Sequence, residues 1–360
     1  MNLDNNRYQR QIQLKEIGQM GQDKIAKAKV LIIGAGGLGS PALQYLVAAG
    51  VGTIGIVDFD IIEMSNLQRQ ILYTVDDIGQ SKAITAAKKL EALNPEIKME
   101  SYNVQITNKN ALEILENYDL IIDGSDNFAT RYLINDACVL LDKPLIYGAV
   151  LRFEGQIGVF NLADETTKSK TNYRDLFQKP PDLASAISCN EVGVLGVIPG
   201  IIGTMQATEA LKIITGIGKP LANKIISYNS LENSFYDFEI DTNPTLDFPK
   251  TKAEFLDYNY NWFCNSNLDV ATLSVEEFEN LRKQEKITII DVRENGELPF
   301  VDEFSFILIP LSEFENRVTT IPTENTIVFF CKSGQRSLRA IKILKEKFPD
   351  CKAYRLAGGI

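Results

Sequence analysis

The chain has 360 residues, of which 45% are hydrophobic, with 47 acidic against 37 basic residues and a formal net charge of −10. This length predicts two domains, the acidic balance argues against a nucleic-acid partner, and the absence of histidine excludes Ser-His-Asp and Cys-His catalysis. The apolar runs are too short to span a membrane and no signal peptide is visible, so we expect a cytoplasmic protein.

Short apolar strands alternate with helical stretches over the first two thirds of the chain. The expected strands are 29–33, 53–57, 98–104, 120–122 and 144–150, and the expected helices include 41–49, 80–93 and 108–116. This alternation predicts an α/β fold with a mostly parallel sheet and helices on both faces. From residue 151 to residue 238 the signals are mixed, with Gly-punctuated strands, a polar loop and one long helix at 200–214.

A domain boundary is expected near residue 241. Residues 241–268 contain two prolines, several Asn and Asp residues and the only Trp, a composition typical of a linker. Helix and strand patterns resume after it and predict a second, smaller α/β unit. We therefore predict three segments: a first domain at 1–240, a linker at 241–268 and a second domain at 269–360.

A glycine-rich loop, Gly34-Ala35-Gly36-Gly37-Leu38-Gly39, joins the first strand to a helix. Glycines let the backbone turn tightly and approach a phosphate, and the helix N-terminus offers free N–H groups. Asp58 ends the next strand, where an acid would hold a ribose hydroxyl. Alone, the loop indicates a nucleotide but does not separate NAD from ATP.

Polar and charged residues behind the ribose acid separate the two nucleotides. Asn66, Arg69 and Lys82 follow it closely, and hydride transfer has no need of them. Cationic side chains there would stabilise the charge on a triphosphate and on the leaving pyrophosphate. Asp126, at a later strand end, is suited to hold Mg²⁺, and Arg10 could reach an active site as a finger.

Several motifs occur in a fixed order between residue 7 and about residue 240: RYQRQIQL, GAGGLGS, DFD, SNLQRQ, GQSKA, DGSDN and GVLGVIPGIIG. Together they resemble the adenylating enzymes that activate the sulfur carriers of molybdopterin and thiamine synthesis, the bacterial relatives of ubiquitin-activating enzymes. The resemblance implies a Rossmann-like domain, ATP and Mg²⁺ as cofactors, and a homodimer in which Arg10 reaches into the partner subunit. It also implies site residues: Gly37 and Asp58 on ATP, Asn66, Arg69 and Lys82 on the phosphates, and Asp126 on magnesium.

The substrate that the resemblance implies is a small ubiquitin-like sulfur carrier ending in Gly-Gly. Its C-terminal carboxylate is already ionised at neutral pH, so adenylation needs alignment and charge neutralisation but no general base. The lack of histidine fits this chemistry. We expect the small subunit of molybdopterin synthase as the carrier, with the thiamine-pathway carrier as the alternative because these motifs are common to both pathways.

Two of the five cysteines lie in motifs that carry chemistry. Cys331 opens a six-residue loop ending at Arg336, between a strand and a helix, where N–H groups and the arginine would favour a thiolate able to carry a persulfide. With the motif IIDVR and the ending LAGGI, the segment resembles a rhodanese sulfurtransferase domain. Cys189 matches a family cysteine that can attack the acyl-adenylate, with a structural role as the alternative. Cys138 and Cys351 are expected to pack in the interior.

Many relatives hold zinc with two CxxC pairs, and this chain departs from that pattern. Asn172 and Asp175 stand at the first pair, and only Cys264 remains near the second. We therefore expect no zinc, and a linker packed by Trp262 and Phe263 instead. The rhodanese-like domain also lacks a usual histidine-containing stretch and a final Trp helix, which leaves its activity open.

A cysteine desulfurase is expected as the sulfur donor. One alternative function is a nicotinamide-dependent oxidoreductase, favoured only by the glycine-rich loop and opposed by Arg69 and Lys82. Another is a non-catalytic scaffold that recruits the carrier and a sulfur donor, suggested by the lost zinc ligands. The intact set of Arg10, Arg69, Lys82 and Asp126 argues against the scaffold.

Overall fold

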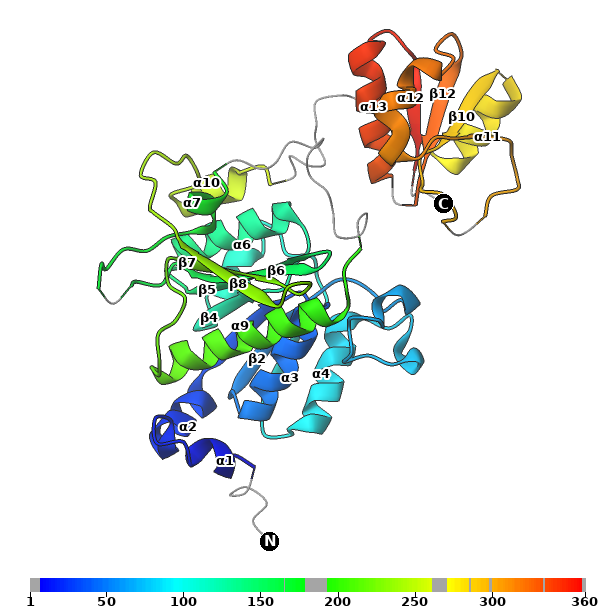
Figure 1. Ribbon diagram of the computed structural model, residues 1–360. Helices are drawn as coiled ribbons and strands as arrows, with labels where there is room; N and C mark the ends of the chain where they lie inside the picture. Colours follow the sequence, from blue (N-terminus) through cyan, green and yellow to red (C-terminus); the bar gives the residue numbers. More distant parts are fainter. Residues whose placement is uncertain are drawn as a thin grey trace. The chain divides into compact units, whose positions relative to one another are not determined.

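The computed structural model describes residues 7–164, 166–178, 193–260, 271–284, 286–297, 300–332 and 334–357. These residues divide into two compact units, the first ending at Tyr260 and the second beginning at Ala271 (Figure 1). Each unit is built around its own sheet. Among the described residues, none of the helices combines the length and apolar character that a membrane crossing requires.

The first sheet has eight strands in the order β3-β2-β1-β4-β5-β6-β7-β8. Strands β1 to β5 are parallel, as expected, and β6, β7 and β8 continue the sheet antiparallel over the region of mixed sequence signals. The bounds are β1 Lys29–Ile33, β2 Thr53–Val57, β3 Lys98–Tyr102, β4 Leu120–Asp123, β5 Leu145–Leu151, β6 Glu154–Phe160, β7 Lys224–Asn229 and β8 Ser234–Glu239. Because the strand order reverses between β1 and β4, their carboxyl ends form the switch point where sheets of this type bind ligands.

Helices cover both faces of this sheet, as the strand-helix alternation predicts. Val30 and Ile32 of β1 face a core shared with α3, α4 and α9, while α5 and α6 pack together elsewhere in the unit (Figure 1). Strand β4 is buried along its whole length, which explains its uninterrupted apolar sequence. The helices are α1 Gln9–Ile12, α2 Gly18–Lys27, α3 Gly39–Ala49, α4 Lys82–Leu93, α5 Ala111–Leu115, α6 Phe128–Leu140, α7 Tyr173–Leu176 and α9 Val197–Thr215.

The segment predicted as a linker contains a helix, α10 (Lys252–Asp257). Thr251 accepts a hydrogen bond from the Glu254 N–H, and the Glu254 carboxylate accepts in return from the Thr251 N–H. This capping box starts the helix, and Phe255 anchors it with a fully buried ring. The sequence did not predict this helix, because a helix of six residues that buries one large side chain shows no apolar periodicity.

The second sheet has five parallel strands in the order β11-β10-β12-β13-β9. Alternate residues of β12 face opposite sides: Phe329 packs with α12 and α13, and Val328 and Phe330 pack on the face toward α11. Sequence patterns predicted β10 and β12 but not the short outer strands, since two residues carry no periodicity. The bounds are β9 Thr272–Leu273, α11 Val275–Gln284, β10 Ile287–Asp291, β11 Ile307–Leu308, α12 Phe314–Arg317, β12 Thr326–Phe330, α13 Gln335–Lys347 and β13 Ala353–Leu356.

Candidate functional site

The glycine-rich loop lies at the carboxyl end of β1, directly beside the end of β4. A Cβ on Gly34 would lie 2.7 Å from the carbonyl oxygen of Gly124, and its φ of +94° is left-handed. A Cβ on Gly39 would lie 1.8 Å from the Gly34 carbonyl oxygen. Side chains at these two positions would push the strand, the loop and α3 apart, so the tight turn depends on glycine.

Asp58 follows β2 and fixes the shape of the loop. Its Oδ2 accepts a hydrogen bond from the Ala35 N–H at 2.8 Å, and its Oδ1 accepts from the Asp60 N–H at 2.9 Å. Burial raises the pKa of Asp58 above its ordinary value, and the Lys82 cation opposes that rise. A carboxylate offers about four lone-pair positions, so two remain for the hydroxyls of a ligand.

Lys82 begins α4 and brings a cation to the same place. Its side chain is only 8% exposed, and Nζ lies 2.9 Å from Oδ2 of Asp60. The buried Tyr73 links this turn to the glycine loop, since its hydroxyl lies 2.9 Å from the Ala35 carbonyl oxygen and 3.2 Å from that of Lys82. The loop, the acid and the lysine are therefore held together as one unit.

The segment that carries Asn66 and Arg69 packs against the glycine-rich loop. Asn66 is buried, and its Oδ1 accepts from the Glu63 N–H at 3.2 Å in a capping box that shapes the turn. The Arg69 guanidinium donates to the Ser65 carbonyl oxygen at 3.0 Å. Its Cγ would lie 3.5 Å from a Cβ on Gly37, so the arginine stem covers the loop. Arg69 therefore lies beside the predicted nucleotide loop, and Asn66 lies in the turn that precedes it.

Two carboxylates end β4 at the same edge. Asp123 is buried, and its Oδ1 accepts from the Ser125 N–H and hydroxyl at 2.9 and 2.6 Å. Burial raises the pKa of Asp123, and the nearby Arg131 cation opposes the rise. Asp126 is exposed, and no other described side chain pairs with it. Because Mg²⁺ takes one or two carboxylates together with substrate phosphate oxygens and water, an exposed carboxylate here fits a magnesium ion.

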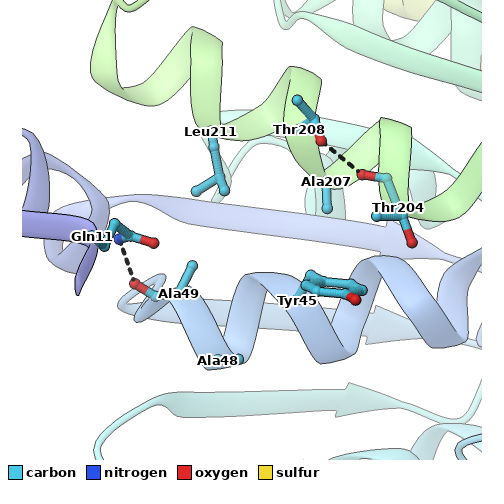
Figure 2. A pocket seen from close by; sticks show the side chains of 8 residues that line it. All are labelled: Gln11, Tyr45, Ala48, Ala49, Thr204, Ala207, Thr208 and Leu211. Atoms are coloured by element: carbon cyan, nitrogen blue, oxygen red, sulfur yellow. Dashed lines mark hydrogen bonds between the residues drawn. The ribbon is translucent and has the colours of Figure 1, made fainter. Parts of the chain in front are cut away.

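Arg10 lies apart from the other predicted residues of the nucleotide site that the structure describes. It is exposed on α1, where the neighbouring Gln11 donates to the Ala49 carbonyl oxygen at 3.2 Å, at the C-terminal end of α3 (Figure 2). Tyr8 on the same segment accepts from Asn94, which follows the C-terminal end of α4. The glycine loop and Lys82 lie at the opposite, N-terminal ends of these helices, which for α3 is roughly 16 Å away.

A groove between α3 and α9 lies on this side of the unit. Figure 2 shows its lining: Gln11, Tyr45, Ala48, Ala49, Thr204, Ala207, Thr208 and Leu211. The Thr208 hydroxyl donates to the Thr204 carbonyl oxygen within α9. None of these lining side chains is a cation that could bind a phosphate, so the groove is separate from the nucleotide site.

A second candidate site lies in the smaller unit, where Cys331 follows β12. The thiol is fully buried, and its Sγ accepts from the Gly334 N–H at 3.1 Å, just before α13 begins. Arg336, in the first turn of α13, forms a two-ended ion pair with Glu297, in which Nη2 and Oε2 are 2.8 Å apart. The Arg336 cation lowers the pKa of Glu297. The sulfur thus lies at a helix N-terminus, as the motif predicts.

The positions that match zinc ligands in relatives serve as a helix cap. Asp175 Oδ2 accepts from the Asn172 N–H at 2.7 Å, and Asn172 caps α7 in return by accepting from the Arg174 N–H. Asp175 Oδ1 also accepts from the Asn243 N–H at 2.7 Å. These side chains therefore tie α7 to the segment that follows β8.

A buried ion pair lies next to that cap. Arg174 donates to both carboxylate oxygens of Asp136 at 2.8 and 2.7 Å, and the two side chains are 3% and 0% exposed. The Tyr260 hydroxyl donates to the same carboxylate at 2.7 Å. Three more aromatic rings surround the guanidinium: Tyr132, Phe248 and Tyr258. This cluster joins α6, α7 and the end of the first unit.

Some predictions fall on positions that the structure does not describe, and some contacts had no sequence signal. Cys189, Trp262, Phe263 and Cys264 all lie outside the described residues. Cys138 is fully buried, as expected, and Cys351 is half-buried. Sequence reasoning missed the pairing of Asp60 with Lys82, although Asp60 lies in the DFD motif, and it missed Tyr73 and Asp123.

Known proteins similar to this chain have names that agree with one another. A model of the ThiF family matches residues 8–247. The sulfur carrier protein adenylyltransferase of Thermus thermophilus is 50% identical over 70% of this chain and 94% of its own length. The probable adenylyltransferase/sulfurtransferase MoeZ of Mycobacterium tuberculosis is 42% identical over 98% of this chain and 91% of its own length. The adenylyltransferase and sulfurtransferase MOCS3 of Xenopus laevis is 38% identical over 96% of this chain and 82% of its own length.

Solved structures share the fold of the larger unit. The crystal structure of E. coli MccB with ATP matches with a TM-score of 0.58 at 24% identity, covering 68% of this chain and 74% of that chain. The crystal structure of SeMet PaaA matches with a TM-score of 0.57 at 23% identity and covers 67% and 74%. At these identities the likeness shows a common Rossmann-like α/β architecture.

Proposed function

The chain belongs to the ThiF family, and on that premise we propose that it is an ATP-dependent adenylyltransferase and sulfurtransferase of a ubiquitin-like sulfur-carrier protein. Its relatives named for both activities match nearly the whole chain, so both activities are assigned to it. We assign adenylation to residues 1–240 and sulfur transfer to residues 269–360; of the predicted linker at 241–268, residues 241–260 pack as part of the first unit. The observation that carries the adenylation half is the buried cation of Lys82 beside Asp58 and the glycine-rich loop.

ATP binds at the carboxyl edge of β1 and β4 in this proposal. The free lone pairs of Asp58 accept from the ribose hydroxyls, and N–H groups of the loop around Gly37 face the phosphates. Lys82 leaves Asp60 for the phosphates when the nucleotide enters. That exchange is open to it because the Asp60 side chain is half-exposed and can be solvated after the ion pair breaks.

Asp126 is the residue that would hold a magnesium ion, because its carboxylate is exposed at this edge of the sheet. A bound Mg²⁺ ion would neutralise part of the charge on the triphosphate. The buried Asp123 positions the turn that carries Asp126, since its carboxylate binds the intervening Ser125 through two hydrogen bonds.

The adenylation step needs no general base. An oxygen of the carrier's C-terminal carboxylate attacks the α-phosphorus, and pyrophosphate leaves with the electron pair of the broken P–O bond. Asn66, Arg69 and Lys82 stabilise the charge that develops on the phosphate oxygens. Because Arg10 lies at the opposite edge of its own sheet, it can act on such a site only from a second copy of the chain, and we infer a homodimer.

Sulfur transfer follows from a persulfide on Cys331. The terminal sulfur attacks the acyl carbon of the carrier adenylate, AMP leaves with the electron pair, and a thiol reductant then cleaves the acyl disulfide to a thiocarboxylate. We infer a cysteine desulfurase as the donor that loads the persulfide, and the molybdopterin-synthase small subunit as the carrier, with the thiamine-pathway carrier as the alternative. A free catalytic thiol and the use of ATP favour the cytoplasm.

The two halves are tested in one experiment with purified full-length protein. ATP–pyrophosphate exchange is measured with each Gly-Gly-ending carrier, and the thiocarboxylate is then measured by mass spectrometry after a persulfide donor is added. Cys331→Ala should keep the exchange and lose the thiocarboxylate. Exchange at background with every carrier would refute adenylation, and thiocarboxylate formation by Cys331→Ala at the wild-type rate would refute the sulfur route.

A further inference from the structure

One residue at the carboxyl edge of β4, Ser125, is bound by two buried charged side chains at once. Its N–H and its hydroxyl donate to Oδ1 of Asp123 at 2.9 and 2.6 Å. Its carbonyl oxygen accepts from Nη2 of Arg131 at 3.0 Å. The exposed fractions are 7% for Ser125, 1% for Asp123 and 9% for Arg131. The turn that contains Ser125 is therefore fixed by a residue of β4 and by a residue of α6.

Arg131 occupies a position where a helix does not favour a cation. It is the fourth residue of α6, and the dipole of a helix disfavours positive charge in the first turn. Two groups compensate for this. The Asp123 carboxylate attracts the cation, and the guanidinium lies over the Tyr147 ring with its Cζ 5.3 Å from the ring centroid. The arginine thus keeps its charge in the interior, where it reaches back to a residue that precedes its own helix.

The turn that Arg131 binds contacts both parts of the proposed nucleotide site. On one side of Ser125, Gly124 packs so closely on the glycine-rich loop that a Cβ there would lie 2.9 Å from the Gly34 carbonyl oxygen. On the other side, Asp126 presents its exposed carboxylate. A shift of Ser125 would therefore move this carboxylate relative to the loop.

We propose that Arg131 is a positioning residue for magnesium–ATP: by binding the Ser125 carbonyl oxygen, it sets the position of the Asp126 carboxylate relative to the glycine-rich loop. The inference rests on the proposed adenylation at this edge, and Arg131 acts there through Ser125 and not on the nucleotide. Magnesium requires its ligands in a nearly ideal octahedral geometry. Loosening this turn therefore weakens the binding of the magnesium complex more than the binding of metal-free ATP.

Calorimetric titration with α,β-methylene-ATP, which cannot be cleaved between those two phosphates, measures this effect without catalysis. The readout is the magnesium ratio, which is the Kd without magnesium divided by the Kd with magnesium for the full-length protein. Arg131→Met removes the guanidinium and should lower the magnesium ratio roughly three- to tenfold. Arg131→Lys should recover part of the ratio, because an ammonium group keeps the charge but not the planar fork of donors.

Hydrogen–deuterium exchange of the ligand-free protein tests the turn itself. The Ser125 N–H is hydrogen-bonded to Asp123, so its exchange requires the turn to open. Peptides that span the end of β4 and this turn should exchange severalfold faster in Arg131→Met than in the wild type. Peptides from α4 should exchange at the same rate in both proteins.

The matched control is the next residue of the same helix. The Tyr132 hydroxyl donates to the Phe177 carbonyl oxygen at 2.7 Å, which follows α7 and is not part of the turn. Tyr132→Phe should lower the free energy of unfolding but leave the magnesium ratio and the exchange of the turn unchanged. An equal fall of the magnesium ratio in Tyr132→Phe would show that Arg131 only stabilises the fold, and would overturn the inference.

A second pair of variants keeps the test decisive if Arg131→Met does not fold. Ser125→Ala removes only the hydroxyl bond to Asp123, and its effect on the magnesium ratio should be non-additive with that of Arg131→Lys, because both changes act on the same turn. Additive effects, or an unchanged ratio in a folded Arg131→Met protein, overturn the inference and leave the proposed adenylation standing. If the wild-type protein does not bind α,β-methylene-ATP, or binds it no better with magnesium, the proposed adenylation site itself fails, and the inference with it.

Discussion

Lys82 is the buried cation on which the proposed adenylation site depends. A buried lysine needs a partner, and Asp60 supplies one that is itself open to solvent, at 52% exposure against 8% for the lysine. The ion pair satisfies the lysine in the absence of a nucleotide, and in the proposed function it is exchanged for a phosphate when ATP binds. The hydrogen bonds of Asp58 and Tyr73 hold the glycine loop in place around it.

Lys82→Ala should lower ATP–pyrophosphate exchange by about two orders of magnitude, because it removes a preorganised cation from the developing charge on the phosphates. The matched control is Lys88→Ala, which removes an exposed lysine from the same helix and should leave exchange unchanged. Exchange is measured with radiolabelled pyrophosphate. A Lys82→Ala protein with wild-type exchange would contradict the proposed role.

Glu297 gives a pH-dependent prediction at the same scale. The Arg336 cation holds its pKa below the ordinary value of 4.5, so the ion pair contributes stability that is complete above that pH. The contribution is lost as the pH falls from 4.5 through the lower pKa of the folded protein. We expect Glu297→Gln to cost about 1 kcal/mol or less near neutral pH and nothing at strongly acid pH.

The measurement for Glu297→Gln is denaturant unfolding of both proteins at a series of pH values. Only the difference between the two free energies of unfolding is used, so the other titrating groups cancel. A difference that stayed constant from pH 7 to strongly acid pH would show that the carboxylate does not titrate as the ion pair requires.

The short helix α7 connects several elements of the first unit. Its cap binds the segment after β8 through Asp175, and Arg174 reaches the carboxylate of Asp136 on α6. Tyr260 joins the same carboxylate from the end of the unit. Hydrogen bonds, a buried charge pair and aromatic rings thus connect elements that are far apart in the sequence.

Asp136→Asn should destabilise the first unit by about 3–5 kcal/mol, because it leaves the buried guanidinium of Arg174 without a matching charge. The comparison variant is Asp237→Asn, which breaks the exposed pair with Lys224 on the edge of the sheet and should move the unfolding midpoint little. Urea unfolding, followed by far-UV circular dichroism, measures the free energy of unfolding of both variants. Equal shifts in the two variants would show that the buried pair has no special weight.

At the scale of the whole molecule, the position of Arg10 bears on assembly. The N-terminal segment is bound at the C-terminal ends of α3 and α4, while ATP is proposed to bind at their N-terminal ends. One chain therefore does not unite all the predicted residues. A closed dimer would complete both sites at once by symmetry.

Mixing two inactive variants tests this arrangement. Arg10→Ala and Lys82→Ala should each be inactive alone, and after subunit exchange the equimolar mixture should regain up to about a quarter of wild-type exchange, since half of the dimers are mixed and each has one intact site. The control mixture is Lys82→Ala with Asp126→Ala, in which no dimer has an intact site. If the first mixture stays as inactive as the control, Arg10 does not act across a dimer.

Local chemistry in the sequence determined the elements and the type of site. Some features depend only on residues that are close in the sequence. They are the glycines at positions 34 and 39, the acid after β2 and the cysteine before a helix. The central parallel strands β1, β2 and β4 were predictable for the same reason, because burial on both faces leaves a short apolar run. The sequence did not predict the helix in the linker or the two-residue strands, because elements this short show no hydrophobic periodicity.

Tertiary structure alone decided which side chains meet. The strand order β2-β1-β4 brings Asp58, the glycine loop and Asp126 to one edge, and no local pattern encodes that order. The register of β12 and β13 brings Arg355 to the loop of Cys331, where the sequence shows only an arginine in a strand. Contacts between distant segments depend on sheet order and register, because these set which side chains share an edge, and a one-residue shift in register would change them.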